Sequence, residues 1–135
     1  MLYTLCYVSS CKNNLTVKDL EHLFRVNKRN NTEHNVSGIL IYNNGNFLQI
    51  LEGDEDLVQT LFKKIRNDAR HSNLITLINN PLDDRIFTDF DSGFIHFEDP
   101  KKRKELHNYI SWLKEAEIKN VDKVVGIVEN FIDKS

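Results

Sequence analysis

Short apolar runs alternate along the chain with segments in which apolar residues recur every three or four positions. Leu2–Ser9 is apolar and ends at the polar stretch Ser10–Asn14, which is typical of a buried strand. From Thr16 the spacing becomes helical, and Thr16 followed by Asp19 has the spacing of a capping box, which marks a helix start. Four later runs are also predicted strands: Gly38–Tyr42, Phe47–Leu51, Leu74–Ile78 and Phe87–Phe97.

Turn and helix signals connect these strands in a definite order. Asn43-Asn44-Gly45 separates the second and third runs, and its residues tolerate positive φ, which predicts a hairpin. We expect the first helix to end in the Asn-rich stretch Asn27–Asn35, and a second helix to begin at Asp54 and Glu55. The order βαββαββ, with right-handed crossovers, predicts an α+β, ferredoxin-like mixed sheet with both helices on one face. The apolar stripe of the second helix is Leu57, Val58, Leu61, Phe62 and Ile65.

Two further amphipathic helices are predicted after Pro100. Because the second face of the sheet needs a cover, we expect these helices to cap that face or to join a dimer. The chain of 135 residues then divides into a domain of residues 1–98 and a C-terminal helical extension of residues 99–135. The apolar positions are Leu106, Tyr109, Ile110 and Leu113 in one helix, and Val121, Val124, Val125, Val128, Phe131 and Ile132 in the other.

Charge and cysteine content exclude several classes of partner and scaffold. Lys plus Arg total 18 against 20 Asp plus Glu, and this near balance gives no electrostatic basis for binding nucleic acid or an anionic membrane. No apolar run approaches the roughly 18 to 20 residues that span a bilayer, and no signal peptide begins the chain, so we expect a cytoplasmic protein. Cys6 and Cys11 are the only cysteines and lack metal-ligand spacing, so neither a metal site nor a disulfide scaffold is expected.

Sequence signatures of enzymes are absent. The chain contains no nucleophile elbow, zinc-binding H-E-x-x-H, Walker-type loop or dinucleotide-binding glycine motif. Acylphosphatase-like hydrolases also use ferredoxin-like sheets, so a small hydrolase stays an alternative, although no matching phosphate loop is present. We therefore expect the protein not to be an enzyme.

Two strands and the first helix carry polar residues on faces that should be buried. Alternation along the strand places Gln49 on the same face as Phe47, and the same rule places Tyr7 on one face with Leu5. Because the predicted topology makes these strands neighbours, we expect Tyr7 and Gln49 to touch. In the first helix, Asn27 and Asn31 share the apolar stripe, and a buried amide needs partners. The alternatives are an ordinary buried Tyr–amide pair and an Asn-rich helix exit.

The second helix is expected to end with a cluster of charged residues. Lys64, Asp68, Arg70 and His71 follow one another near Ile65. Such a cluster is usually a solvated face, but it could instead meet a phosphate or the polar edge of a ring.

Several separated segments resemble the BLUF domains, a family that senses blue light using FAD, here of the short stand-alone type. The resemblance runs in register from Leu2 to about Phe97. It implies an isoalloxazine ring between the two helices, with Asn31 bonding the polar edge of the ring and Gln49 between Tyr7 and the flavin. The matching segments are Tyr3–Ser10, Asn30–Asn31, Val36–Tyr42, Phe47–Gly53 and Ile65–His71.

The same resemblance implies the remaining pocket residues, the cofactor and the partners. The cofactor would be FAD, with FMN as the alternative. Flavin, a second copy of the chain and an unidentified downstream protein are the expected partners. Asn27 stands where the family commonly has a small hydroxyl residue, and Lys64 where Arg or His is common. The implied pocket residues are Tyr7, Leu23, Asn27, Asn31, Leu40, Phe47, Gln49, Lys64, Ile65, Asp68, Arg70 and His71.

The family mechanism implies a light reaction in which no bond to the protein forms. Excited flavin takes an electron and then a proton from Tyr7, the radical pair recombines, and Gln49 is left rotated or as a different tautomer. The chain departs from the family in its last strand, where Phe90-Asp91-Ser92 replaces a Trp-Ser-Met segment. We expect Ser92 to face the pocket, where its hydroxyl could bond Gln49 or leave room for water. The alternative is a degenerate BLUF module that serves only for interaction.

Overall fold

The computed structural model describes residues 1–11, 16–68, 71–87, 94–116 and 121–133. The predicted order of strands and helices is confirmed, with two helices at the C-terminal end. The elements are β1 (Leu2–Cys11), α1 (Val17–Glu33), β2 (Ser37–Asn43), β3 (Asn46–Asp54), α2 (Glu55–Arg66), β4 (His71–Pro81), β5 (Phe94–His96), α3 (Pro100–Glu115) and α4 (Val121–Asp133).

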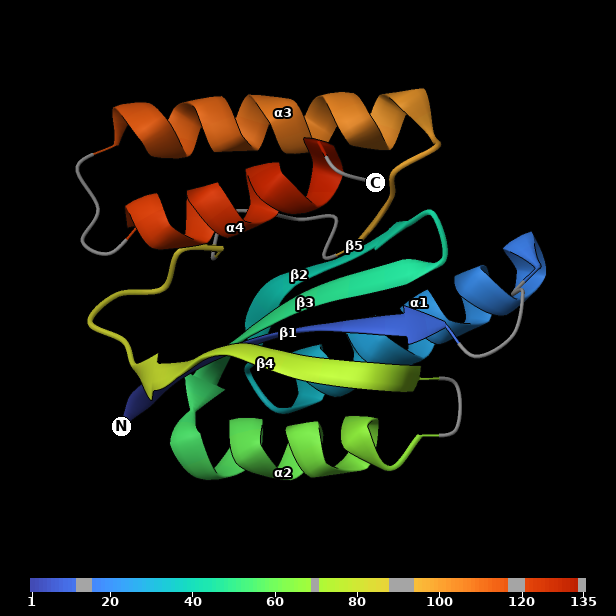
Figure 1. The fold of residues 1–135 in the computed structure, drawn as a ribbon. Coiled ribbons are helices and arrows are strands. Elements are labelled where there is room, and N and C mark those ends of the chain that lie inside the picture. The colour runs from blue at the N-terminus through green and yellow to red at the C-terminus, as the bar shows by residue number, and fades with distance from the viewer. Residues whose placement is uncertain (12–15, 69–70, 88–93, 117–120, 134–135) are drawn as a thin grey trace.

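The five strands form one mixed sheet in the order β4-β1-β3-β2-β5. β1 is antiparallel to both β3 and β4, and β2 is antiparallel to β3 but parallel to β5. Figure 1 shows α1 and α2 on one face of the sheet, and α3 and α4 on the other. We call these the α1/α2 face and the α3/α4 face. The arrangement confirms the predicted ferredoxin-like α+β fold.

The hairpin turn and the start of the first helix are each determined by a few neighbouring residues. The hairpin between β2 and β3 turns at Asn44 and Gly45, which have φ values of 50° and 77°. Both central residues of a type I′ turn require positive φ, which Asn and Gly adopt at little cost. At the start of α1, the Asp19 N–H donates to Thr16 Oγ1 and the Thr16 N–H donates to Asp19 Oδ2, each at 3.1 Å. The predicted capping box is therefore present.

On the α1/α2 face, the end of the first helix is as predicted and the end of the second is not. α1 ends at Glu33, inside the predicted Asn-rich stretch, and the left-handed φ of 52° at Asn35 breaks the helix. α2 stops earlier than predicted, at Arg66, so that Asp68 follows the helix and His71 begins β4. On the predicted stripe of α2, Leu57 is exposed, whereas Val58, Leu61 and Phe62 are buried.

The last two strands also differ from the prediction. β4 is longer than the predicted Leu74–Ile78 because hydrogen bonding with β1 extends its pairing at both ends. Of the predicted strand Phe87–Phe97, Phe94–His96 pairs with β2, and residues 88–93 lie outside the described residues. The prediction is wrong at Phe87, because Ile86 and Phe87 form a bend whose backbone N–H groups donate to a side chain.

The larger apolar core lies between the sheet and the two C-terminal helices, which confirms that they cover the second face. Residues from the sheet, such as Ile41, Leu48 and Ile50, pack there with Leu106 and Val128. On the α1/α2 face the core is divided in two. Around α2 it consists of Leu5, Tyr7, Val36, Leu51, Val58, Leu61 and Phe62, and around α1 of Leu20, Phe24, Leu40 and Phe47.

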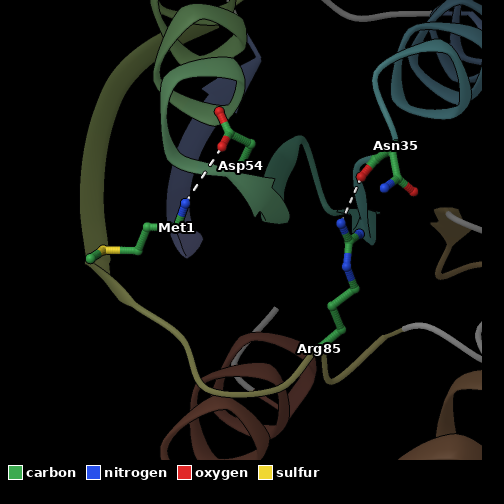
Figure 2. Close-up of polar contacts among 4 residues, drawn as sticks. All are labelled: Met1, Asn35, Asp54 and Arg85. Atoms are coloured by element: carbon green, nitrogen blue, oxygen red, sulfur yellow. Dashed lines mark hydrogen bonds and ion pairs between the residues drawn. The ribbon is translucent and has the colours of Figure 1, made fainter.

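The ends of β1 and β3 meet beside α2. The Met1 amino group lies 3.6 Å from Asp54 Oδ1, and Figure 2 shows this exposed ion pair. Within the part of the chain that the structure describes, no helix is long and apolar enough to cross a membrane.

Thr4 offers a test of the packing at the centre of the sheet. Its side chain is 4% exposed, and its hydroxyl has no hydrogen-bond partner among the described residues. A buried polar group without a partner costs about 1 to 3 kcal/mol. We expect Thr4→Val to raise the free energy of unfolding by about 1 kcal/mol in urea denaturation. The matched change at the exposed Thr76, on neighbouring β4, should stay within about 0.5 kcal/mol. A Thr4→Val variant less stable than the original protein would contradict this account.

Candidate functional site

The site begins with two polar side chains that the sheet brings together. Tyr7 and Gln49 are directly opposite in the register of β1 and β3, and both point to the α1/α2 face. The Tyr7 hydroxyl donates to Gln49 Oε1 at 2.5 Å. The side chains are 1% and 2% exposed, so the bond is shielded from water. The contact expected from strand alternation is therefore present.

A third polar side chain reaches the pair from α1. Gln49 Nε2 donates to Asn27 Oδ1 at 2.9 Å. The hydrogen bonds thus run from β1 through β3 to α1, and they satisfy the carbonyl oxygen and one N–H of the Gln49 amide. Asn27 can make this bond because α1 extends to Glu33 and so includes it.

Apolar side chains lie on both sides of this polar chain. Leu40 and Phe47 are buried with the α1 part of the core, and Leu23 packs against them. Ile65 packs with the α2 part, which contains Tyr7. Phe62 was not predicted as a site residue, yet its ring centroid lies 5.7 Å from that of Tyr7. Its position three residues before Ile65, on the same helical stripe, was the signal that could have identified it.

The predicted charged cluster is divided by the structure. Lys64 lies in the last turn of α2 with its side chain exposed, whereas Asp68 is half-buried and close enough to Tyr7 to affect its pKa. Arg70 lies outside the described residues, as does Ser92. The backbones of Asn31 and His71 belong to α1 and β4, but their side chains lie outside the described part.

The electrostatics of the site keep Tyr7 as a proton donor. Burial raises the pKa of the Tyr7 phenol far above its ordinary value, and the nearby Cys6 and Asp68 raise it further. The phenol is therefore neutral throughout the physiological range. A neutral phenol must donate through its only O–H, and that donation holds the carbonyl end of the Gln49 amide toward Tyr7.

The donor set fits a planar heteroaromatic group with acceptors on its edge. The Gln49 amide has two N–H groups, one of which donates to Asn27, and the other can donate to a ring carbonyl or nitrogen. Leu23, Leu40 and Phe47 on one side, and Phe62 and Ile65 on the other, supply apolar surface that suits ring faces. The chemistry of these residues is compatible with a flavin. No group of acidic, His or Cys side chains in the described ranges could hold a metal ion.

Comparison with known proteins assigns the chain to a class of light sensors. A family model described as sensors of blue-light using FAD matches residues 2–93. The chain belongs to this family, the BLUF family. The cofactor expected from the sequence, FAD, is the one named in the family description, and the expectation of a sensor rather than an enzyme is confirmed for the matched region. Neither alternative, a hydrolase or a degenerate module, is favoured by these matches.

Relatives and solved structures extend this likeness. Photoactivated adenylate cyclase subunit beta of Euglena gracilis is 36% identical over 86 residues, which cover 64% of this chain and 10% of the relative. The dark-state structure of the BLUF protein BlrB is 26% identical, with a TM-score of 0.67, and the match covers 81% of this chain and 94% of BlrB. Klebsiella pneumoniae BlrP1 with FMN and cyclic diGMP has a TM-score of 0.81 at 24% identity, covering 98% of this chain and 36% of BlrP1.

The bond from Gln49 to Asn27 gives a prediction for stability. Asn27→Ala would leave a buried Gln49 N–H without its acceptor, so we expect the free energy of unfolding to fall by about 1 to 2 kcal/mol in urea denaturation. Lys28→Ala, one position along the exposed side of α1, is the control and should change it by less than about 0.5 kcal/mol. Equal stabilities of the two variants would remove Asn27 from the network.

Proposed function

We propose that the protein is a blue-light photoreceptor that holds an oxidised flavin non-covalently beside Tyr7 and Gln49, between α1 and α2. FAD is the proposed cofactor, and FMN is the alternative. The observation that carries this proposal is the buried hydrogen bond from Tyr7 to Gln49 on the α1/α2 face. A sensor that works by hydrogen-bond rearrangement needs such a pair. The phenol can be oxidised, and the amide hydrogen-bonded to it can rotate or change tautomer and later return.

Residues from both helices would hold the flavin. Asn31 would bond the polar edge of the ring, and the apolar residues on either side of Gln49 would contact its faces. Lys64, Arg70 and His71 would supply cationic or hydrogen-bonding groups to the flavin. When bound, the flavin supplies a chromophore that absorbs blue light and, once excited, accepts an electron and a proton and then returns them.

The side chains of this chain would supply the donor and the switch. Oxidation makes a phenol strongly acidic, so the Tyr7 proton leaves along its hydrogen bond toward Gln49. When the charges recombine, the Gln49 amide is left rotated or as a different tautomer. Its donor and acceptor ends then face different partners. Asn27 can follow this change, because a side-chain amide both donates and accepts. The Asn27 amide would thus take the part of the hydroxyl that is common in the family.

The two parts of the chain would have different tasks in this proposal. Residues 1–98 would bind flavin, and residues 99–135 would be the output element, because α3 and α4 cover the face opposite the site. A second copy of the chain and a downstream protein are the proposed partners. The chain spans 10% of the Euglena relative and 36% of BlrP1. The partners and the output proposed for this chain are therefore not taken from those longer proteins.

Tyr7→Phe tests the proposed photochemistry directly. The ring shape and the contact with Phe62 should survive, so flavin binding should remain, whereas the phenolic proton needed for the light reaction is absent. We expect this variant to lose the reversible light-induced red shift in a light-minus-dark absorption spectrum. Tyr3→Phe is a matched control, because Tyr3 lies on the same strand and its hydroxyl donates to Asn79 instead. A normal red shift in Tyr7→Phe would contradict the proposed role of Tyr7.

A further inference from the structure

Glu52 is a buried carboxylate that the proposed photochemistry does not use. It lies on β3 three residues after Gln49, but its side chain points to the α3/α4 face and is 0% exposed. The carboxylate accepts hydrogen bonds from the backbone N–H groups of Ile86 at 2.7 Å and Phe87 at 2.9 Å. Burial raises the pKa of Glu52, and the bonds from Phe87 and Ile86 oppose that rise. The side chain thus ties the bend after β4 to the central part of the sheet.

Ser37 and Arg85 complete this connection. The Ser37 hydroxyl donates to Glu52 Oε1 at 3.0 Å and accepts from Arg85 Nη1 at 2.9 Å. Arg85 Nη1 also lies 3.2 Å from the Glu52 carbonyl oxygen, to which it donates. Arg85 Nη2 donates to the Asn35 carbonyl oxygen at 2.8 Å, as Figure 2 shows. We call Glu52, Ser37, Arg85 and the N–H groups of Ile86 and Phe87 the Glu52 clasp.

From the clasp, contacts continue to the surface of α3. The Tyr109 hydroxyl donates to the Ile86 carbonyl oxygen at 2.7 Å. The Tyr109 ring stacks on Phe87 with a centroid distance of 5.8 Å and lies 5.5 Å from the ring of Trp112. Trp112 is 47% exposed. An unbroken series of contacts therefore joins β3 to an exposed aromatic residue on α3.

We propose that Glu52 is the positioning residue through which a rearrangement of Gln49 on one face of the sheet displaces α3 on the other. The inference rests on the proposed photoreceptor function. Gln49 and Glu52 share one strand, so a shift of β3 that accommodates a rearranged amide also moves the Glu52 carboxylate. Charge-assisted hydrogen bonds to two consecutive N–H groups have steep geometric requirements, so the bend at residues 86 and 87 follows the carboxylate. Tyr109 then follows the bend.

The chain offers a site-specific probe of this movement, because Trp112 is its only tryptophan. Protein labelled with 5-fluorotryptophan gives one ¹⁹F resonance, which reports the surroundings of Trp112 on α3. The flavin absorption of the same sample reports the photochemistry. In the original sequence we expect blue light to cause the reversible red shift and to displace the ¹⁹F resonance.

Glu52→Gln removes one of the two hydrogen bonds from the Ile86 and Phe87 N–H groups while keeping the shape of the side chain. One amide end of glutamine can accept from Ile86 or Phe87, but the NH₂ end cannot accept from the other N–H. We expect this variant to keep the red shift and to lose the light-induced displacement of the ¹⁹F resonance. Tyr109→Leu, which removes both contacts of Tyr109 with the bend, should give the same result and serves if Glu52→Gln does not fold. Glu129→Gln is the control, because it makes the same change of charge in the exposed 2.9 Å pair with Lys114 that joins α3 to α4, outside the Glu52 clasp. It should keep both signals.

The two readouts separate failure of this inference from failure of the proposed function. A full ¹⁹F displacement in Glu52→Gln or in Tyr109→Leu, together with a normal red shift, would overturn the role of Glu52. A normal red shift without any ¹⁹F displacement in the original sequence would also overturn it. Absence of the red shift in the original sequence would instead overturn the photoreceptor proposal.

Discussion

A primary amide buried in a strand of an apolar sheet needs partners for both of its ends, and in this protein the amide of Gln49 imposes that requirement on the elements around it. The carbonyl end accepts a hydrogen bond from the Tyr7 hydroxyl, and this bond requires the observed register of β1 on β3. The N–H end donates to Asn27, and this bond requires that α1 continue beyond its last apolar turn. A slip of one residue between β1 and β3 would turn Tyr7 to the other face and leave the amide unsatisfied.

The two faces of the sheet are built for different tasks. On the α3/α4 face one continuous apolar core joins the sheet to the C-terminal helices. On the α1/α2 face the core is divided, and the polar chain through Gln49 lies between its two parts. β3 contributes to both faces, because alternate residues of a strand point in opposite directions. The strand that carries Gln49 toward α1 therefore also carries Glu52 toward α3.

Patterns that depend on near neighbours in the sequence were predicted well. The hairpin at Asn44 and Gly45 and the capping box at Thr16 each follow from a few adjacent residues, and strand alternation placed Tyr7 opposite Gln49. The end of α1 in the Asn-rich stretch was also predicted, because Asn tolerates the left-handed conformation that Asn35 adopts. The end of α2 was predicted less well, because the charged residues up to His71 suggested a longer helix than the one that stops at Arg66.

Contacts between residues far apart in the chain were beyond such patterns. Glu52 binds Ile86 and Phe87, 34 and 35 positions away, and no local periodicity indicates that a carboxylate in an apolar strand ends on those N–H groups. The same contact explains why the predicted strand Phe87–Phe97 does not begin at Phe87, because the N–H of Phe87 donates to Glu52 rather than to a neighbouring strand. The family resemblance supplied the expected flavin, whereas the bond from Gln49 to Asn27 became evident only from the structure.

The absorption spectrum of the purified protein, recorded before and after blue light, tests the central claim most directly. The account predicts a yellow protein with a structured oxidised-flavin band that shifts slightly to the red on illumination and returns in the dark. A colourless protein that cannot be reconstituted with FAD or FMN would contradict it, as would a flavin-loaded protein whose spectrum does not respond to light.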